Sequence, residues 1–162
     1  MAGHDELLAV ALEASLSGKG AHAPSLDIFD GLDWKLAGVR PAGAPHSIYQ
    51  LLSHVTYWQA WVAAWLNGKT PRVPKHASGS WPGGVAPAGK REWDRAVKDF
   101  RKGLAAIERA VGEGDLAAQR KGSSRMEMIR AIASHNSYHF GQAVVLRQML
   151  RAWPPPSGGV TW

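Results

Sequence analysis

Residues 46–68 read HSIYQLLSHVTYWQAWVAAWLNG, and this stretch decides the fold. Its apolar residues recur every three or four positions, which predicts one long amphipathic helix. Ser47 is suited to cap the first turn of this helix, and Gly68 is suited to end it. At about 100° per residue, with Leu51 as the reference, His54 lies about 60° from the centre of the apolar face. A histidine is therefore expected to project toward the interior or its edge.

The stretch SHNSYHFGQ, residues 134–142, places His135 and His139 four positions apart in a second long helix. His139 falls within about 40° of the centre of the apolar stripe and His135 about 60° to one side, one turn apart. Burying three imidazoles without partners is costly, because each ring needs a donor and an acceptor satisfied. A divalent cation would satisfy three lone pairs at once. The sequence therefore favours a metal site formed by His54, His135 and His139 over three ordinary core histidines.

The expected donor set limits the chemistry of such a site. Three neutral imidazoles suit Zn²⁺, Ni²⁺ or another first-row ion, and such sites typically keep a position open for water or substrate. The chain has no cysteine, which excludes thiolate ligands and a protein thiol nucleophile. Asn136 follows His135 where the metalloprotease motif H-E-x-x-H has its glutamate. Without a carboxylate ligand the ion keeps its full double charge, which favours Lewis acidity.

Several other side chains are candidates for roles near this centre. His22 lies at the break after the first predicted helix and is a candidate fourth ligand or proton shuttle with a catalytic role. A ligating histidine generally needs its other ring nitrogen fixed, and three side chains could do this: Tyr57, Tyr138 and Gln142. Three aromatic residues are expected in the core and the cavity wall: Trp58, Trp61 and Trp65. The remaining histidines are expected to be exposed to solvent: His4, His46 and His76.

The whole chain is expected to form a single all-α domain, residues 1–162, built as a four-helix bundle. The helices are predicted at about 5–32 with a break at 18–24, 47–67, 90–111 and 124–151. Whether the first is one kinked helix or two stays open, and residues 34–46 form a loop. Residues 68–89 show no helical or strand period and exceed the usual loop length, so they are either disordered or a functional covering segment. No stretch shows convincing alternation of a β-strand.

Composition narrows the class of protein and its partners. The chain is 45% hydrophobic and 20% charged, as in a globular protein. Its net charge of +6 comes largely from residues 90–130, where acids are interspersed, and no nucleic-acid-binding motif is present. No apolar run approaches the roughly 18 residues that a membrane span needs, and the N-terminus does not resemble a secretory signal. We expect a cytoplasmic protein with a small-molecule substrate, no nucleic-acid partner and no membrane partner.

The paired stretches 46–68 and 135–150 resemble the DinB-like, or YfiT-like, family of metal-dependent enzymes. The resemblance implies a four-helix bundle with up-down-down-up connectivity, in which residues 68–89 form the long crossover. It also implies zinc or nickel held by three ligands, His54, His135 and His139. Characterised relatives in this family include transferases and isomerases that use low-molecular-weight thiols such as bacillithiol or mycothiol, and many other members have no known activity.

The resemblance suggests that the metal binds an external thiol as thiolate, which then attacks an electrophile. The expected activity is that of a metal-dependent thiol S-transferase or hydrolase. A non-catalytic metal- or ligand-binding bundle is the alternative, and a homodimer is left open.

Overall fold

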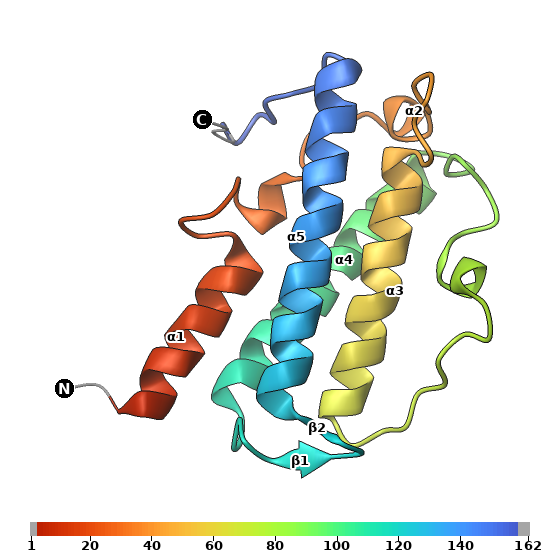
Figure 1. Cartoon of the computed structure of the whole chain (residues 1–162). Helices are drawn as coiled ribbons and strands as arrows, with labels where there is room; N and C mark the ends of the chain where they lie inside the picture. The colour runs from red at the N-terminus through yellow and green to blue at the C-terminus, as the bar shows by residue number, and fades with distance from the viewer. Residues whose placement is uncertain (1–2, 159–162) are drawn as a thin grey trace.

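The computed structural model describes residues 3–158 and contains a bundle of four long helices (Figure 1). Their bounds are α1 (His4–Ser17), α3 (Ile48–Leu66), α4 (Lys90–Gly112) and α5 (Arg125–Met149). In the view of Figure 1 the chain rises in α1, descends in α3 and α4 and rises again in α5. Helix α3 packs against α4 and α5, and α1 closes the bundle against both of these. The predicted all-α bundle with up-down-down-up connectivity is confirmed.

Reciprocal caps fix the starts of the two helices that carry the histidines. The Ser47 hydroxyl accepts from the Gln50 backbone N–H at 3.2 Å, and the Gln50 side chain accepts from the Ser47 N–H at 3.0 Å. Ser124 and Glu127 form the same box at the start of α5. Each box satisfies two backbone N–H groups that a helix otherwise leaves unpaired. The N-cap predicted at Ser47 is confirmed.

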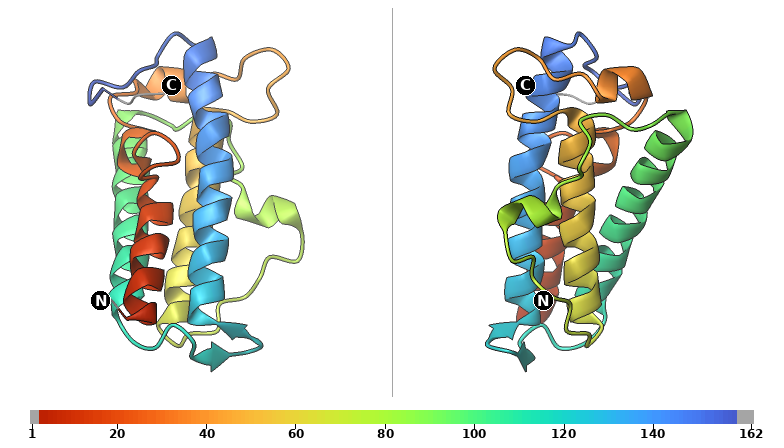
Figure 2. Two further views of the ribbon diagram at one scale, coloured as in Figure 1. Left: turned by 60° about the vertical axis from the view of Figure 1, so that its left-hand side comes forward. Right: turned by 90° about the vertical axis from the view of Figure 1, so that its right-hand side faces the viewer.

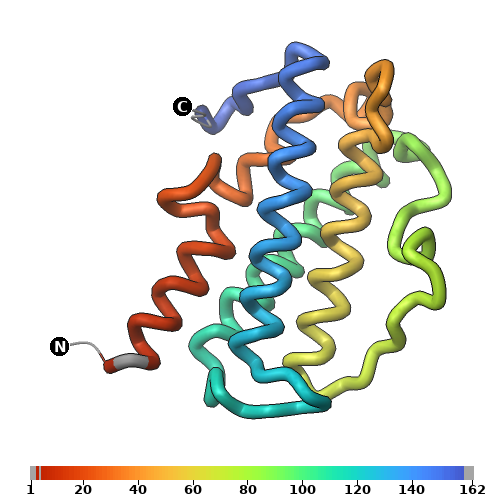
Figure 3. Tube along the Cα trace, viewed as in Figure 1, coloured from red at the N-terminus to blue at the C-terminus, as the bar shows by residue number. Residues whose placement is uncertain are grey.

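The crossover from α3 to α4 runs the length of the bundle (Figure 3). It contains one 3₁₀ turn, η2 (Ala77–Ser80), which lies over the outer side of α3 and α5 in the right-hand view of Figure 2. The segment is tied to α3, because the Ser47 hydroxyl donates to the Val85 carbonyl and the Trp61 indole donates to the Arg72 carbonyl. Of the two alternatives for residues 68–89, the structure supports a covering segment.

The prediction of a helix over residues 25–32 is wrong. Only one 3₁₀ turn forms there, η1 (Ser25–Asp27), and the chain then turns through Gly31, whose φ is +61°. Ile28 and Phe29 are nevertheless almost fully buried. The apolar residues whose spacing suggested a helix are instead buried as part of a turn. Phe29 of this turn packs edge-to-face on Phe100 of α4 and on Phe140 of α5.

Two short elements were not predicted. Helix α2 (Trp34–Ala37) lies within the expected loop and begins where the Asp33 side chain accepts from the Lys35 N–H. Strands β1 (Gln119–Arg120) and β2 (Ser123–Ser124) pair antiparallel just before α5. The two residues between the strands, Lys121 and Gly122, both have positive φ, as a two-residue hairpin of the common primed type requires. These elements leave the all-α class unchanged.

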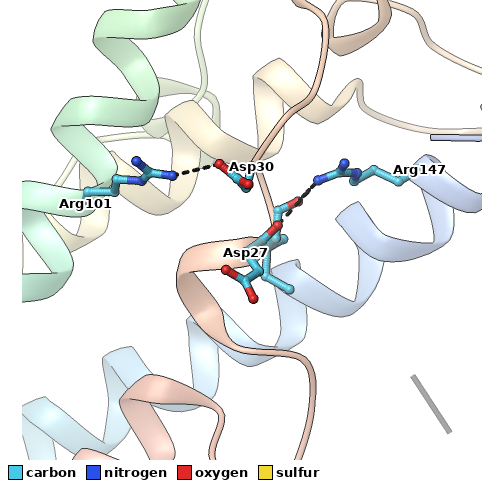
Figure 4. Close-up of polar contacts among 5 residues, drawn as sticks. Asp27, Asp30, Arg101 and Arg147 are labelled. Atoms are coloured by element: carbon cyan, nitrogen blue, oxygen red, sulfur yellow. Dashed lines mark hydrogen bonds and ion pairs between the residues drawn. The ribbon is translucent and has the colours of Figure 1, made fainter. Parts of the chain in front are cut away.

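A buried arginine near the end of α5 anchors residues 25–31 (Figure 4). The Arg147 guanidinium is only 1% exposed and donates to the carbonyls of Ile28 at 2.8 Å and Ala152 at 2.9 Å, with a longer contact to Asp27. On the other side of this segment, Arg101 of α4 pairs with the Asp30 carboxylate at 3.1 Å. The segment is thereby fixed between α4 and α5 at one end of the bundle.

Within residues 3–158, no helix has both the length and the apolar character that crossing a membrane requires. The predicted single domain 1–162 and the cytoplasmic location stay predictions. Residues 1–2 and 159–162 of that range lie outside the described part of the chain.

Candidate metal centre

Three histidines from two helices meet between α3 and α5. His54 projects from α3, and His135 and His139 project from successive turns of α5. One ring nitrogen of each lies within 4.8 Å of the corresponding nitrogens of the other two. His54 and His139 are each 7% exposed, and His135 is half-buried. The residues predicted from helical geometry to come together do so.

Hydrogen bonds decide which nitrogen of two of the rings faces the cluster. The His54 Nδ1–H donates to the Ser80 carbonyl at 3.2 Å, because a carbonyl can only accept. In the same way the His139 Nδ1–H donates to the Gln142 Oε1 at 2.8 Å. In a neutral imidazole this leaves each Nε2 as a lone-pair acceptor.

The third ring, that of His135, places one of its nitrogens close to the His54 ring. Nε2 of His135 lies 3.1 Å from Nε2 of His54. The His135 Nδ1 is buried and has no hydrogen-bond partner among the described residues. Two ligand nitrogens of a tetrahedral zinc ion are about 3.3 Å apart, given Zn–N bonds of about 2.0–2.1 Å. The spacing of this pair therefore fits a shared ion as well as it fits a shared proton.

Burial keeps the three imidazoles neutral. Loss of solvent lowers the pKa of His54 and of His135 to about 4, and it lowers the pKa of His139 as well. The neighbouring imidazoles contribute to this lowering for His54 and His135, because two positive rings would repel each other. At neutral pH the rings therefore carry free lone pairs, which is the form that binds metal.

The crossover covers the cluster through Trp81; a covering segment was one of the two alternatives predicted for residues 68–89, but the role of Trp81 was not predicted. The Trp81 indole stacks on the His54 ring with centroids 3.9 Å apart and planes within 8°. On its other face Trp81 stacks on His46 at 3.8 Å. His46 is thus half-buried rather than exposed as predicted, whereas His76 is exposed as expected. The only sequence signal for this role is a tryptophan among the glycines and prolines of the crossover.

His22 lies outside the group of three. Its Nδ1 donates to the Ala23 carbonyl at 2.7 Å, and its Nε2 contacts the Ser137 hydroxyl at 3.0 Å. Since both ring nitrogens already have protein partners, this arrangement gives no support to a fourth-ligand role. His22 reaches α5 through Ser137, which lies between the two α5 histidines of the cluster in the sequence.

The other residues predicted to lie near the metal centre either contact its histidines or line the neighbouring cavity and core. Gln142 holds His139, as predicted for one of the three candidates. Tyr138 is 66% exposed, with its ring centroid 5.0 Å from that of His139, and Tyr57 packs against Trp58. Trp58 and Trp61 line a cavity that His135 also lines. Trp65 is a buried core residue.

The donor set fits a divalent metal ion. Three neutral nitrogen donors are available, and no carboxylate within residues 3–158 joins the group. Imidazole is the ligand that zinc, nickel and other late first-row ions share. A centre with three protein ligands leaves a coordination position for an exogenous molecule.

Comparison with known proteins identifies a family. No curated protein matches the chain. The sequence profile described as the DinB superfamily matches residues 21–143, a range that contains all three clustered histidines, all of α3, the crossover and most of α5. Because this match covers most of the 162 residues, the chain belongs to the DinB superfamily.

Proposed function

We propose that this protein is a metal-dependent enzyme whose ion is held by His54, His135 and His139. The observation that carries the proposal is the convergence of three neutral imidazoles, two buried and one half-buried, with one ring nitrogen of each within 4.8 Å of those of the other two and the Nε2 atoms of His54 and His135 3.1 Å apart. Lone pairs that face each other in a buried site are unfavourable unless a proton or a cation lies between them. We propose zinc or nickel as that cation.

We further propose that the centre activates a low-molecular-weight thiol or water for transfer to, or hydrolysis of, a small electrophilic molecule. A bound divalent ion supplies Lewis acidity, which lowers the pKa of water or a thiol so that its anion is available near neutral pH. The chain has no cysteine, so a thiol nucleophile has to come from a second small molecule.

The roles of the protein's own residues follow from their contacts. Ser80 and Gln142 hold the rings of His54 and His139 by their Nδ1 atoms, which aims Nε2 at the ion. Trp81 covers the face of His54 and keeps water from it. His22 is proposed as a neighbour of the centre that acts through Ser137, and not as a ligand.

Metal titration of tag-free protein tests the proposal. Wild-type protein is expected to bind one zinc or nickel ion per chain, measured by calorimetry and by elemental analysis after gel filtration. His54→Ala and His139→Ala are each expected to lose at least about 100-fold in affinity, because two imidazoles alone bind weakly. The matched control is His76→Ala, which removes an exposed histidine. Full retention of the ion in both site variants would overturn the proposal.

A second assay separates catalysis from binding. The metal-loaded protein is incubated with thiols and small electrophiles, and turnover is compared before and after removal of the ion. We expect turnover that is lost with the ion and restored when it is added back. A protein that binds its ion but shows no turnover would instead be a non-catalytic metal-binding bundle.

A further inference from the structure

A small apolar cavity opens beside the histidine cluster, between α3 and α5. Its volume is about 330 Å³, and its walls include Trp58, Trp61, Met128, Ala131 and His135. We call it the tryptophan cavity. His135 is the only one of its lining residues with a titratable side chain, and it is one of the three proposed ligands. The cavity therefore adjoins the metal centre directly.

The walls of this cavity are aromatic and held in place. The Trp58 ring packs edge-on to His54 and to His135, each at 6.4 Å between centroids. The Trp61 ring lies 6.0 Å from Trp58 with the planes 58° apart, and its indole N–H is bound to the Arg72 carbonyl of the crossover. Two indoles fixed at an angle offer faces and edges to a flat apolar group.

The cavity has the composition of a binding site for an uncharged group. No acidic or basic side chain lines it apart from the imidazole of His135. A volume of about 330 Å³ accommodates one aromatic ring with its linker but not a large polar cosubstrate. A charged group placed there would lose its hydration without gaining a partner.

From these contacts we propose that the tryptophan cavity binds an uncharged aromatic substituent of the small-molecule substrate, while the polar head of the same molecule reaches the metal. This inference rests on the proposed function, because the head needs the ion as its anchor. It adds a substrate class to that function: a small electrophile that carries an aryl group a short distance from its reactive atom.

Hydroxamates provide the test, because they share one metal-binding head and differ in the attached group. Zinc-loaded full-length protein is titrated with acetohydroxamate, benzohydroxamate and 4-carboxybenzohydroxamate by calorimetry, at concentrations that leave zinc on the protein. Benzohydroxamate is expected to bind roughly 10- to 100-fold more tightly than acetohydroxamate, the gain for burying one phenyl-sized group. The added carboxylate is expected to abolish that preference.

Two variants assign the preference to this cavity. Ala131→Leu adds bulk from an exposed helical position in the wall, and Trp61→Leu removes one indole; each should reduce the preference for benzohydroxamate at least threefold. Zinc and acetohydroxamate affinity should stay at the wild-type level in both. The matched control is Gly141→Leu on the same helix, which lines a separate cavity of about 530 Å³ and where an added Cβ meets no atom within 4 Å.

Each outcome decides the inference. Zinc binding with equal affinity for benzohydroxamate and acetohydroxamate would overturn the cavity proposal and leave the proposed function standing. Loss of the preference in Gly141→Leu but not in Ala131→Leu would move the aryl group to the other cavity and overturn the assignment. Failure to bind zinc would remove both proposals. Sedimentation will also show whether the protein is a dimer. If Ala131→Leu breaks that dimer and the wild type shows no aryl preference, the cavity walls belong to an interface with a second copy, and the inference is overturned.

Discussion

Helix α5 carries a buried guanidinium near its end and two imidazoles near its middle, one buried and one half-buried, and the two polar clusters differ in what faces them. Arg147 is a donor surrounded by carbonyl acceptors of Asp27, Ile28 and Ala152. In the histidine cluster, about 12 to 18 Å away along the helix axis, imidazole nitrogens face one another, and His54 and His135 share at most a proton between them. The first cluster is complete within the protein, whereas the second leaves lone pairs that a cation would satisfy.

The two clusters also respond differently to the loss of solvent. Burial lowers the pKa of Arg147, but the nearby Asp30 carboxylate opposes this effect, and an arginine side chain remains charged in proteins. Burial lowers the pKa of His54 and His135 to about 4 and leaves those rings neutral. Complementary partners make a structural anchor, while lone pairs without donors make a receptor for a cation. This difference can be tested one cluster at a time.

The largest effect on folding is expected at the guanidinium. Arg147→Met leaves buried carbonyls without a donor, so it should lower the free energy of unfolding of the metal-free protein by about 3 kcal/mol or more, measured by urea titration. Arg101→Met is the control, because its pair with Asp30 is partly exposed and should contribute at most about 1 kcal/mol. Folded Arg147→Met should still bind zinc with near wild-type affinity. Equal destabilisation by the two substitutions would contradict the anchor role.

The next largest effect is expected where the protein orients a proposed ligand. Gln142→Leu removes the acceptor of the His139 Nδ1–H, so that ring loses its fixed orientation. Zinc affinity should fall about 10- to 100-fold at unchanged stoichiometry, as calorimetry would show. Gln148→Leu, an exposed position on the same helix, should leave the affinity unchanged. Wild-type affinity in Gln142→Leu would mean that this hydrogen bond does not support the ion.

The part of this comparison that concerns the histidines was predictable from sequence. Helical periodicity placed His54, His135 and His139 on buried faces, and the serines at 47 and 124 marked the helix starts, because these signals are local and regular. A covering role for the crossover was one of two alternatives predicted from its length, but the stacking of Trp81 on His54 was not predictable, since it joins residues 27 positions apart through a segment without period.

Other features depended on contacts between distant parts of the chain. Residues 25–32 have helical apolar spacing, yet they fold as turns because Phe29 fills a space between α4 and α5 and Arg147 binds the carbonyls of the segment. The hairpin before α5 had a local signal that was missed, the Lys121–Gly122 turn, but its strands are too short to show alternation.

A smaller effect is expected from acid on the metal-free protein. Well above pH 6.5 the imidazoles are neutral in the folded and unfolded states and contribute no pH dependence. Between about pH 6.5 and 4 the unfolded chain binds protons that His54 and His135 do not bind in the folded state, so stability falls as the pH falls.

Urea titrations at several pH values check this expectation. At pH 5 the wild-type chain should bind up to about two more protons on unfolding than the chain of the double variant His54→Leu/His135→Leu does. Taking the difference between the two proteins cancels the contribution of the carboxylates. Parallel curves for the two proteins over this pH range would show that the rings are not kept neutral by burial.

The smallest effect is expected from replacing one imidazole with an apolar side chain at neutral pH. His135→Leu removes a nitrogen that lies 3.1 Å from the Nε2 of His54 and another that has no partner within the described residues. Metal-free His135→Leu should therefore be as stable as the wild type, within about 1 kcal/mol, or more stable. His76→Leu, at an exposed position, sets the baseline.

Zinc is expected to reverse the order of stability of the wild type and His135→Leu. At a free concentration 100-fold above the dissociation constant it should stabilise the wild type by about 2.7 kcal/mol and leave His135→Leu nearly unchanged. Thermal unfolding with and without zinc measures both differences. A His135→Leu protein that is much less stable than the wild type without metal would mean that the imidazole cluster is complete by itself, as the Arg147 cluster is, and that it has no need of a cation.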